Sequence, residues 1–543
     1  MKKSITVLLL CVLAVSAGAQ SKGFKLGKWT EIQNSIIKEL NRSYVDSLPL
    51  DRIERAGVDA MLGDLDPYTI YIPEEEDEDL QMMINKSYGG IGAIIYKPDV
   101  DGNVIINEPY AGSPAAKAGL QCGDQIMAID GVSVKGLTSS QASDKMRGVP
   151  DSKVVFKVKK VRSGVEKDIT IVRKTIHLPD IEYYGMLDDT TGYILQSGFT
   201  DGVAQSLRNA VSDLKKKGMK KLFYDLRGNG GGLLGEAVDI VSLFVPKGSL
   251  VVTARGRENG SSYECTTQNA PVDTILPLVV LVDSGSASAS EIVSGALQDL
   301  DRATIMGGRT FGKGLVQSIR PLPYGGKMKL TTAKYYTPSG RCVQAIDYAR
   351  RNEDGSVGHI PDSLTHEFKT AHGRTVRDGG GITPDVQLKF NEYSRLTISL
   401  IYSGVIEQYA MQYVTKHESI PSAVDFHLQD ADYEDFIEYA KGKQFDFRSS
   451  AKTYFDLMKK ELDKDGLSDS MKPVLDSLGK TIEIEKEDFL RLKKDEIVPF
   501  IEEEIVVRYY YQAAGVQLRL RYDDQLREAL KSPLIEMPLE QLP

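Results

Sequence analysis

Hydrophobic side chains recur at helical spacing in residues 20–87. Trp29, Ile32 and Ile36 follow one another at intervals of three and four residues. Side chains at these intervals share one face of a helix, so this region is predicted to be helical. It ends in the acidic run of residues 74–79, which we interpret as a solvated helix start without a function of its own.

From residue 88 the period shortens, and apolar runs alternate with turns. Extended segments are expected at residues 91–96, 104–107, 154–161 and 169–172, with turns at Asp101-Gly102 and Ser163-Gly164. Short helices are predicted to open at Ser113, which is followed by a proline, and near Ser139. Residues 88–175 are therefore predicted to form a compact half-barrel.

In residues 176–390, segments with the spacing of a helix alternate with extended segments. A helical stripe over residues 203–214 lies between extended segments at 192–198 and 221–226. The apolar run at 275–282 is typical of a buried strand, and a helix that carries Ile292 follows it. This alternation predicts an α/β core with a buried sheet.

The remaining residues, 391–543, are charged and helical in period, most clearly at 396–414 and 482–520. No catalytic pattern occurs among them. We expect a helical platform or a dimer surface there, through which the chain forms a homo-oligomer. The fold class predicted for the whole chain is multidomain α/β.

Composition narrows the possible functions. The chain has 543 residues, of which 41% are hydrophobic, enough to bury several cores, so a disordered or fibrous protein is excluded. With 67 basic and 76 acidic residues the formal net charge is −9, which does not favour a polyanion as partner. No nucleic-acid partner is expected.

The first nineteen residues have the pattern of a secretory signal. Lys2 and Lys3 precede an apolar stretch, and small residues run up to Ala19, the expected cleavage position. Cys11 leaves lipidation as an alternative. No later segment has the 18 or more apolar residues of a membrane span. The protein is expected to be exported, periplasmic or otherwise extracytoplasmic, and possible membrane association rests on Cys11.

Three cysteines remain after that cleavage: Cys122, Cys265 and Cys342. They are too few and too far apart for a disulfide framework or a zinc site. Buried single thiols are expected, and neither a metal nor another cofactor is predicted.

Two glycine-rich segments resemble phosphate-binding loops. Residues 307–313 match G-x-x-x-x-G-K, but Gly314 follows where Ser or Thr is required. The pattern of the next residues predicts an extended segment rather than a helix. Residues 230–235 match the dinucleotide fingerprint between a strand and a helix, yet the next strand ends in Arg255 instead of an acid. The alternative for residues 230–235 is an anion hole made of consecutive backbone N–H groups.

A serine run at residues 285–291 follows the strand at 278–283 directly. A hydroxyl at the end of a strand, with a free N–H after it, is the usual geometry of a nucleophile and its oxyanion hole. No histidine occurs between residues 178 and 358, so a Ser-His triad is disfavoured. The histidines at 359, 366 and 372 fit no metal motif and are expected in a surface loop.

Lys313 is the better candidate for a base. To accept a proton a lysine must be neutral, so burial must lower its pKa from about 10.4 by about 2 to 4 units. Phe311 and Leu315 can exclude water there. If the segment is extended, Gln317 lies on the same face as Lys313 and can orient its amine.

These residues lie in blocks that resemble one family. The blocks are SASASEI at 286–292, GALQD at 295–299, TFGKGLVQ at 310–317, LDPY at 65–68, GGIG at 89–92, GDQI at 123–126, DLRGNGGG at 225–232 and YTPSG at 336–340. Taken in their order along the chain, the blocks resemble the carboxyl-terminal processing peptidases, also called tail-specific proteases. The resemblance spans about residues 30–390.

The resemblance implies a serine endopeptidase with a Ser-Lys mechanism. Ser288 would be the nucleophile, Lys313 the general base and Gln317 the residue that orients it. The N–H groups of Ala289 and Gly232 would form the oxyanion hole.

The half-barrel resembles a PDZ domain, which binds a peptide as an added strand. Gly90, Ile91 and Gly92 would bind the terminal carboxylate of an unfolded substrate, and Arg147 would couple the domain to the active site. An activator or adaptor protein is a further expected partner. Here Asp151 replaces the glycine usual near Arg147.

The sequence departs from the family pattern at two places, and two alternative functions remain open. Tyr68 stands where the family usually has histidine, and residues 352–381 form an apparent insertion. The chain could also be a PDZ-centred scaffold with an inactive or latent peptidase fold, or a dinucleotide enzyme. All three proposed catalytic residues are present, which argues against the scaffold.

Overall fold

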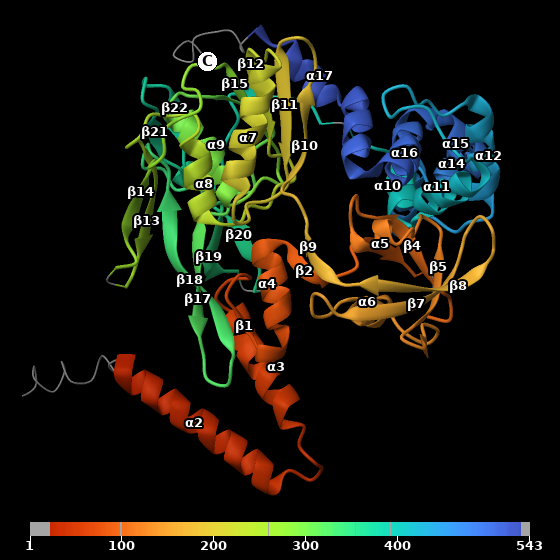
Figure 1. Ribbon diagram of the computed structural model, residues 1–543. Helices are drawn as coiled ribbons and strands as arrows, with labels where there is room; N and C mark the ends of the chain where they lie inside the picture. The colour runs from red at the N-terminus through yellow and green to blue at the C-terminus, as the bar shows by residue number, and fades with distance from the viewer. Residues whose placement is uncertain (1–21, 98–99, 259, 353–354, 391, 534–543) are drawn as a thin grey trace, which may run out of the picture. The chain divides into compact units, whose positions relative to one another are not determined.

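The computed structural model describes residues 22–97, 100–258, 260–352, 355–390 and 392–533 (Figure 1). The predicted signal segment, residues 1–19, lies outside the described residues. The chain divides into two compact units, with the boundary between Tyr71 and Ile72.

The first unit contains the helices expected near the N-terminus. They are α2 (Lys22–Ser43) and α3 (Leu50–Gly63), followed by the short strand β1 (Ile70–Ile72). No described side chain of α2 is buried, and Trp29 and Ile36 are exposed. The sequence pattern missed β1 because three residues are too few to show a period.

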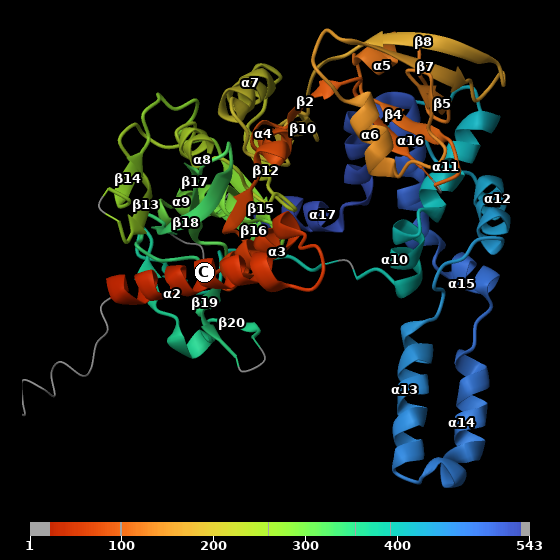
Figure 2. The same cartoon turned by 90° about the horizontal axis from the view of Figure 1, so that it is seen from below.

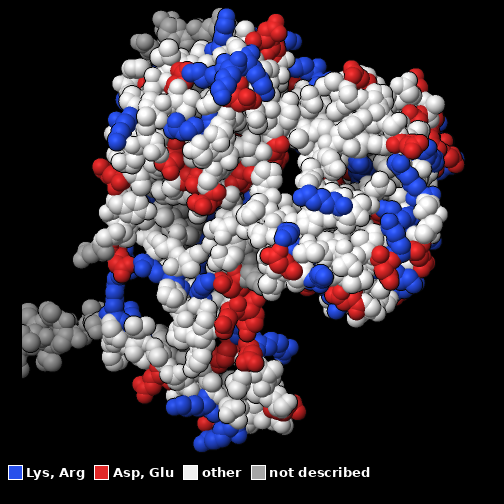
Figure 3. Space-filling model, viewed as in Figure 1, with Lys and Arg blue, Asp and Glu red and all other residues white. Residues whose placement is uncertain are grey.

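The second unit opens with η1 (Glu74–Glu76) and α4 (Asp77–Asn85). The acidic run is thus a helix start, as expected, and its first helical residue Asp77 pairs with Lys327. On the face shown in Figure 3, acidic and basic side chains are interspersed, with an acidic group near the start of α4. A group of basic side chains also lies at the upper edge of this face.

Residues 87–177 form the predicted half-barrel. Its strands are β2 (Ser87–Gly90), β3 (Ala93–Tyr96), β4 (Val104–Pro109), β5 (Gln125–Ile129), β6 (Val132–Ser133), β7 (Lys153–Lys159), β8 (Glu166–Val172) and β9 (Lys174–His177). The main sheet has the antiparallel order β3-β4-β5-β7-β8. Val154, Phe156 and Val158 are fully buried while their neighbours face outward, so the period of two is set by burial of one face.

Both short helices of this unit begin where the caps predict. α5 (Pro114–Lys117) starts after Ser113, whose Oγ accepts the N–H of Ala116 at 3.1 Å. α6 (Ser139–Met146) starts after Thr138, which forms a reciprocal capping box with Gln141.

The strands that enter and leave the half-barrel pair with each other. β2 and β9 form an antiparallel ribbon in which Ser87 lies opposite His177 and Gly90 opposite Lys174. The half-barrel is therefore an insertion whose two ends meet at one place.

The core sheet has the order β10-β11-β12-β15-β16-β23. These strands are β10 (Ile181–Met186), β11 (Thr191–Gln196), β12 (Lys221–Asp225), β15 (Leu278–Val282), β16 (Thr304–Gly307) and β23 (Val386–Gln387). All pairs are parallel except β10 with β11. This is the α/β core that the alternating pattern predicts.

Helices cover both faces of this sheet. One face packs on α7 (Val203–Lys216), α8 (Leu234–Val241) and α9 (Ala289–Asp299), and it buries Ile194, Tyr224 and Val280 (Figure 1). The alternate side chains, among them Tyr193, Phe223 and Leu281, pack on Val516 and Leu526 from the C-terminal region. Because both faces are covered, successive residues in the middle of β11, β12 and β15 are apolar.

A second sheet lies beside the core and contributes to the site. Its antiparallel order is β17-β18-β13-β14, with β13 (Leu250–Gly256), β14 (Tyr263–Thr266), β17 (Leu315–Pro321) and β18 (Lys327–Tyr336). The register of β17 shifts between Val316 and Gln317. The extra residue is Thr332, so the bulge lies in β18.

The apparent insertion is more ordered than the expected surface loop. It contains β20 (Val357–His359), which pairs with β19 (Ile346–Arg351) just before the insertion. After η2 (Asp362–Leu364) it forms a hairpin of β21 (Glu367–Lys369) and β22 (Thr375–Arg377). His366 is exposed, whereas Arg374 between the strands of this hairpin is largely buried. One buried arginine gives no periodic signal in a sequence.

The C-terminal region is helical, as predicted. Its helices are α10 (Arg395–Tyr402), α11 (Val405–Lys416), α12 (Asp430–Lys441), α13 (Ser450–Lys464), α14 (Ser468–Ile482), α15 (Lys486–Leu492), α16 (Lys494–Arg519), η3 (Leu520–Tyr522) and α17 (Asp524–Leu530). Tyr409, Phe436 and Ile501 lie in its core. α13 and α14 form an antiparallel hairpin that extends away from this core (Figure 2).

No helix among the described residues is both long enough and apolar enough to cross a membrane. Cys122, Cys265 and Cys342 are all free thiols.

Candidate active site

Ser288 lies where β15 passes into α9. Its backbone has φ 57° and ψ −112°, a conformation that residues other than glycine rarely adopt. Ala289 is the first residue of α9, so its N–H has no partner within the helix. The serine is therefore presented on a strained turn with a helix N-terminus directly behind it.

Glu291 connects the serine to the Lys313 segment. Its fully buried carboxylate accepts the N–H of Ser288 at 2.9 Å and the N–H of Lys313 at 2.8 Å. It also accepts the N–H of Gly312 at 2.7 Å and the hydroxyl of Thr310 at 2.6 Å. Burial raises the pKa of Glu291, and these hydrogen bonds oppose that shift.

Tyr335 makes a second connection between the two segments. Its buried hydroxyl lies 3.1 Å from the carbonyl oxygen of Ser288 and 2.5 Å from that of Lys313. One side chain thus contacts both backbones from β18, while Glu291 contacts them from α9. The spacing of the two segments is fixed from two directions.

Ser288, Lys313, Gln317 and Gly232 line one cavity of about 470 Å³. The sequence singled out all four, and the structure brings them together. The amide nitrogen of Gln317 lies 3.3 Å from the hydroxyl of Thr331 on β18. Lys313 lies two residues before β17 and Gln317 lies within it, and both line this cavity.

The glycine turn packs directly against the serine. A Cβ atom on Gly231 would lie 2.8 Å from the nitrogen of Ala289, and one on Gly232 would lie 2.4 Å from the carbonyl oxygen of Phe199. Both glycines have positive φ, at 96° and 154°. Among the described residues, the N–H groups of Gly232 and Ala289 donate to no other group. They are available to an anion beside Ser288.

The loop at residues 307–313 leads into β17 rather than into a helix. The phosphate-loop interpretation is thereby excluded, because its lysine loop must open a helix that carries the phosphate.

The residues expected to bind a tail carboxylate lie at the end of the ribbon. Gly90, Ile91 and Gly92 are buried. A Cβ on Gly90 would lie 3.9 Å from the Cα of Arg147, so this loop adjoins the end of α6. The Arg147 guanidinium stacks over the ring of Tyr88, 5.4 Å from its centre. In this conformation the loop is covered.

Three family models match successive parts of the chain. "Peptidase family S41" matches residues 190–349, and a PDZ domain matches residues 105–160. "Probable PDZ-protease, C-terminal helical domain" matches residues 396–532. The third match gives the helical region a family of its own, which the sequence pattern alone did not reveal.

A carboxy-terminal-processing protease from Bartonella bacilliformis is 38% identical to this chain over 320 residues, which cover 57% of this chain and 71% of the relative. The chain belongs to this family of S41 peptidases. It is therefore a serine peptidase with a PDZ domain. A probable CtpA-like serine protease from Staphylococcus aureus is 33% identical over 314 residues, covering 58% of this chain and 62% of that protein.

Among solved structures, the photosystem II D1 C-terminal processing protease aligns with 65% of this chain and 91% of its own chain. The sequence identity is 26% and the TM-score is 0.34.

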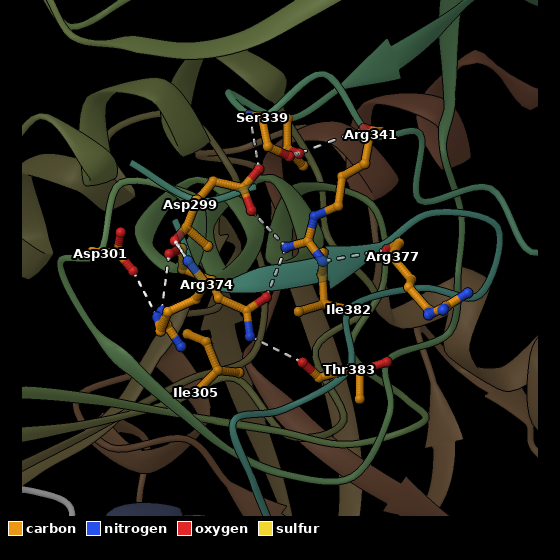
Figure 4. Close-up of polar contacts among 12 residues, drawn as sticks. Asp299, Asp301, Ile305, Ser339, Arg341, Arg374, Arg377, Ile382 and Thr383 are labelled. Carbon is orange, nitrogen blue, oxygen red and sulfur yellow. Dashed lines mark hydrogen bonds and ion pairs between the residues drawn. The ribbon is translucent and has the colours of Figure 1, made fainter. Parts of the chain in front are cut away.

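The far end of the S41 peptidase helix α9 is held by buried ion pairs (Figure 4). Asp299 pairs with Arg341 at 2.8 Å, and both side chains are almost completely buried. Arg374 from the insertion pairs with Asp301 at 2.7 Å and with Asp385 at 2.6 Å. The helix that presents Ser288 is thus fixed at both ends.

Sequence reasoning missed Glu291 as part of the site, although a signal was present. Ser288 and Glu291 have the S-x-x-E spacing of a capping box. Its contacts with the Lys313 segment are long-range, so no local pattern could have shown them.

Arg227 of this peptidase, just before the glycine turn, lies between two carboxylates. One nitrogen of its guanidinium is 2.5 Å from Asp225 and 2.5 Å from Asp523, and Gln525 accepts from another at 3.0 Å. Tyr193 donates to Asp225 at 2.7 Å. Asp523 and Gln525 come from the C-terminal helical region, about 300 residues away along the chain. No pattern in the sequence indicates this contact.

The PDZ domain also contacts the helical region. Arg508 of α16 donates to Asn107 at 2.6 Å, and Gln512 donates to Glu108. The backbone of α16 is non-helical at Tyr511, with φ 68°. α16 therefore contacts the PDZ domain, and Asp523, which follows α16 and η3 along the chain, contacts the peptidase core.

Proposed function

We propose that this chain is an exported endopeptidase that captures unstructured C-terminal tails and cleaves them by a Ser-Lys acyl-enzyme mechanism. The observation that carries this proposal is the single cavity lined by Ser288, Lys313, Gln317 and Gly232. No histidine is among the described residues that line that cavity, and Lys313 lines it together with Ser288, which supports Lys313 as the base.

In the acylation step Lys313, as the neutral amine, takes the proton from the hydroxyl of Ser288. The serine oxygen attacks the scissile carbonyl carbon, and the negative charge that develops on the carbonyl oxygen is stabilised by the N–H groups of Gly232 and Ala289. When the tetrahedral intermediate collapses, the C–N bond breaks and the leaving amine takes the proton from Lys313.

In the deacylation step Lys313, neutral again, accepts a proton from water. The hydroxide attacks the ester carbon, the bond to the serine oxygen breaks, and that oxygen regains its proton from Lys313. Gln317 orients the amine from β17. After both steps Ser288 is again a hydroxyl and Lys313 a neutral amine, with water as the co-reactant.

Tail capture is assigned to the PDZ domain. β3 pairs only with β4 among the described strands, so its other edge can accept a peptide as an added strand. The tail carboxylate then reaches the loop of Gly90, Ile91 and Gly92. Since this loop is covered, binding requires movement at the end of α6, where Arg147 packs on Tyr88.

Export is inferred from the signal pattern of residues 1–19. The mass of the protein isolated from the cell envelope tests it, because an exported chain should have lost these residues.

Homo-oligomer formation through the terminal helices is supported by exposed apolar side chains on α2 and on the α13–α14 hairpin, such as Trp29, Leu457 and Val474. Light scattering of Trp29→Asp and Leu457→Asp variants tests this, and a wild-type monomer contradicts it. An activator or adaptor is the further partner, to be sought by cross-linking to the PDZ domain.

The decisive experiment compares cleavage of an unfolded protein with a free apolar C-terminus by wild type, Ser288→Ala and Lys313→Met. We expect both variants to lose at least about 1,000-fold in kcat/KM while retaining cooperative thermal unfolding. Cleavage by folded Ser288→Ala contradicts the mechanism. If wild type binds the tail reversibly and never cuts it, the chain is a PDZ-centred scaffold.

A further inference from the structure

The catalytic cavity has a charge opposite to that of the chain. Its described lining contains Lys86, Lys313 and Lys329 and no aspartate or glutamate, whereas the whole chain has a net charge of −9. Low-dielectric walls concentrate the field of such charges inside a cleft. This cavity therefore attracts anionic groups.

Two of the three lysines do not offer a free positive charge to a substrate. The ammonium group of Lys86 lies 2.8 Å from the carboxylate of Asp180, whose side chain is almost fully buried. Lys313 is neutral when it acts as the base in the proposed mechanism. The positive charge that remains for a bound substrate is that of Lys329.

Lys329 lies half-buried on β18, opposite Ile319 of β17. Ile319 also lines the cavity and is two residues beyond Gln317, which is about 7 Å along a strand. Burial lowers the pKa of Lys329, and among the described residues its ammonium makes no ion pair or side-chain hydrogen bond. A partly desolvated cation without a partner gains from meeting a carboxylate.

We propose that Lys329 forms a carboxylate-binding subsite of the substrate cleft. Its ligand is either an aspartate or glutamate side chain of the tail or the free C-terminal carboxylate. The proposal rests on the proposed peptidase function and extends it, since it adds charge selectivity at the cleft to tail capture by the PDZ domain.

The experiment uses the full chain and matched peptides. One series places Glu or Gln at each position within three residues of the cleaved bond, and a second ends in a free carboxylate or an amide. Wild type should prefer one acidic peptide about tenfold in kcat/KM, the usual scale for a hydrogen bond to a charged group. In Lys329→Met this preference should fall to about one, and in Lys329→Arg it should persist.

The two possible sources of the carboxylate are distinguished by comparing the peptide preferences of wild type with those of the Lys329 variants. A Glu over Gln preference that depends on Lys329 identifies a side chain as the ligand. A preference for the free acid over the amide that vanishes in Lys329→Met identifies the terminal carboxylate. An acid preference that survives in Lys329→Met belongs to the PDZ domain instead and contradicts the proposed subsite.

Lys334→Met is the matched control, because Lys334 is an exposed lysine on the same strand. It should behave as wild type with every peptide. If wild type cleaves Glu and Gln peptides equally well, and free-acid and amide peptides equally well, that result contradicts the proposed subsite and leaves the proposed peptidase function intact. If wild type cleaves nothing, the proposed peptidase function itself fails.

Discussion

At the scale of single residues, Glu291 has the greatest influence on the geometry of the site. One carboxylate accepts hydrogen bonds from Ser288, Thr310, Gly312 and Lys313. A carboxylate has about four lone-pair directions, so all of them are used here. The serine and the lysine segment are positioned by the same two oxygen atoms.

Glu291→Gln should therefore impair catalysis without abolishing the fold. The amide replaces one acceptor oxygen by an NH₂ group, which meets backbone N–H donors that then lose their partner. We expect kcat/KM to fall about 100-fold and the free energy of unfolding to fall by about 2 kcal/mol. Peptide cleavage assays and thermal unfolding measure the two effects.

Glu236→Gln provides the control for that change. Glu236 of α8 also accepts two backbone N–H groups, from Gly202 at 2.9 Å and Ala204 at 2.8 Å. These contacts lie at the start of α7, and Glu236 does not line the catalytic cavity. The Glu236→Gln variant should be less stable than wild type and equally active. Equal activity losses in both variants would show that Glu291 acts only through stability.

At the scale of elements, the glycine turn between β12 and α8 shapes the oxyanion hole. Gly231→Ala should abolish cleavage, because the added Cβ would lie 2.6 Å from the carbonyl oxygen of Ala287 and 2.8 Å from Ser288 Cβ. Its positive φ adds strain. We expect a loss of at least about 100-fold in kcat, as for removal of an oxyanion donor.

Gly235→Ala tests the specificity of that effect. A Cβ at Gly235, in α8, meets nothing within 4 Å. Alanine is also preferred over glycine inside helices, so this variant should be as active as wild type and slightly more stable. Comparable losses at both glycines would contradict the assignment of the turn.

The elements themselves were largely predictable, and their contacts were not. Periodicity located α7, α9 and three strands of the core sheet, β11, β12 and β15, but not β10, β16 or β23. Motif spacing located Ser288, Lys313 and Gln317. Asp523 and Arg374 could not be found in this way, because each is one polar residue whose partner is far away in sequence.

At the scale of the whole molecule, the C-terminal helical region is connected to the catalytic machinery through Asp523. Asp523→Asn should lower kcat/KM about tenfold, because Arg227 loses one of its two charged partners next to the glycine turn. Asparagine still caps α17, where Asp523 accepts the N–H of Leu526 at 2.9 Å. Folding should therefore be preserved, and cleavage kinetics give the readout.

Asp524→Asn is the neighbouring control, since Asp524 and its partner Arg527 are both more than half exposed. An exposed pair contributes little, so activity should not change. Tail binding, measured by fluorescence anisotropy, should be the same in both variants. Weaker tail binding by Asp523→Asn would place its effect in the PDZ domain rather than at the turn.

The β2–β9 ribbon has a consequence for engineering. Adjacent strands are about 4.8 Å apart, so the PDZ domain begins and ends at neighbouring points of the core and can be exchanged for another recognition module with short linkers. Such a chimera would uncover Arg508 of α16, whose side chain is 1% exposed. Retargeting this peptidase to new proteins therefore requires redesign of that helix surface as well as of the graft.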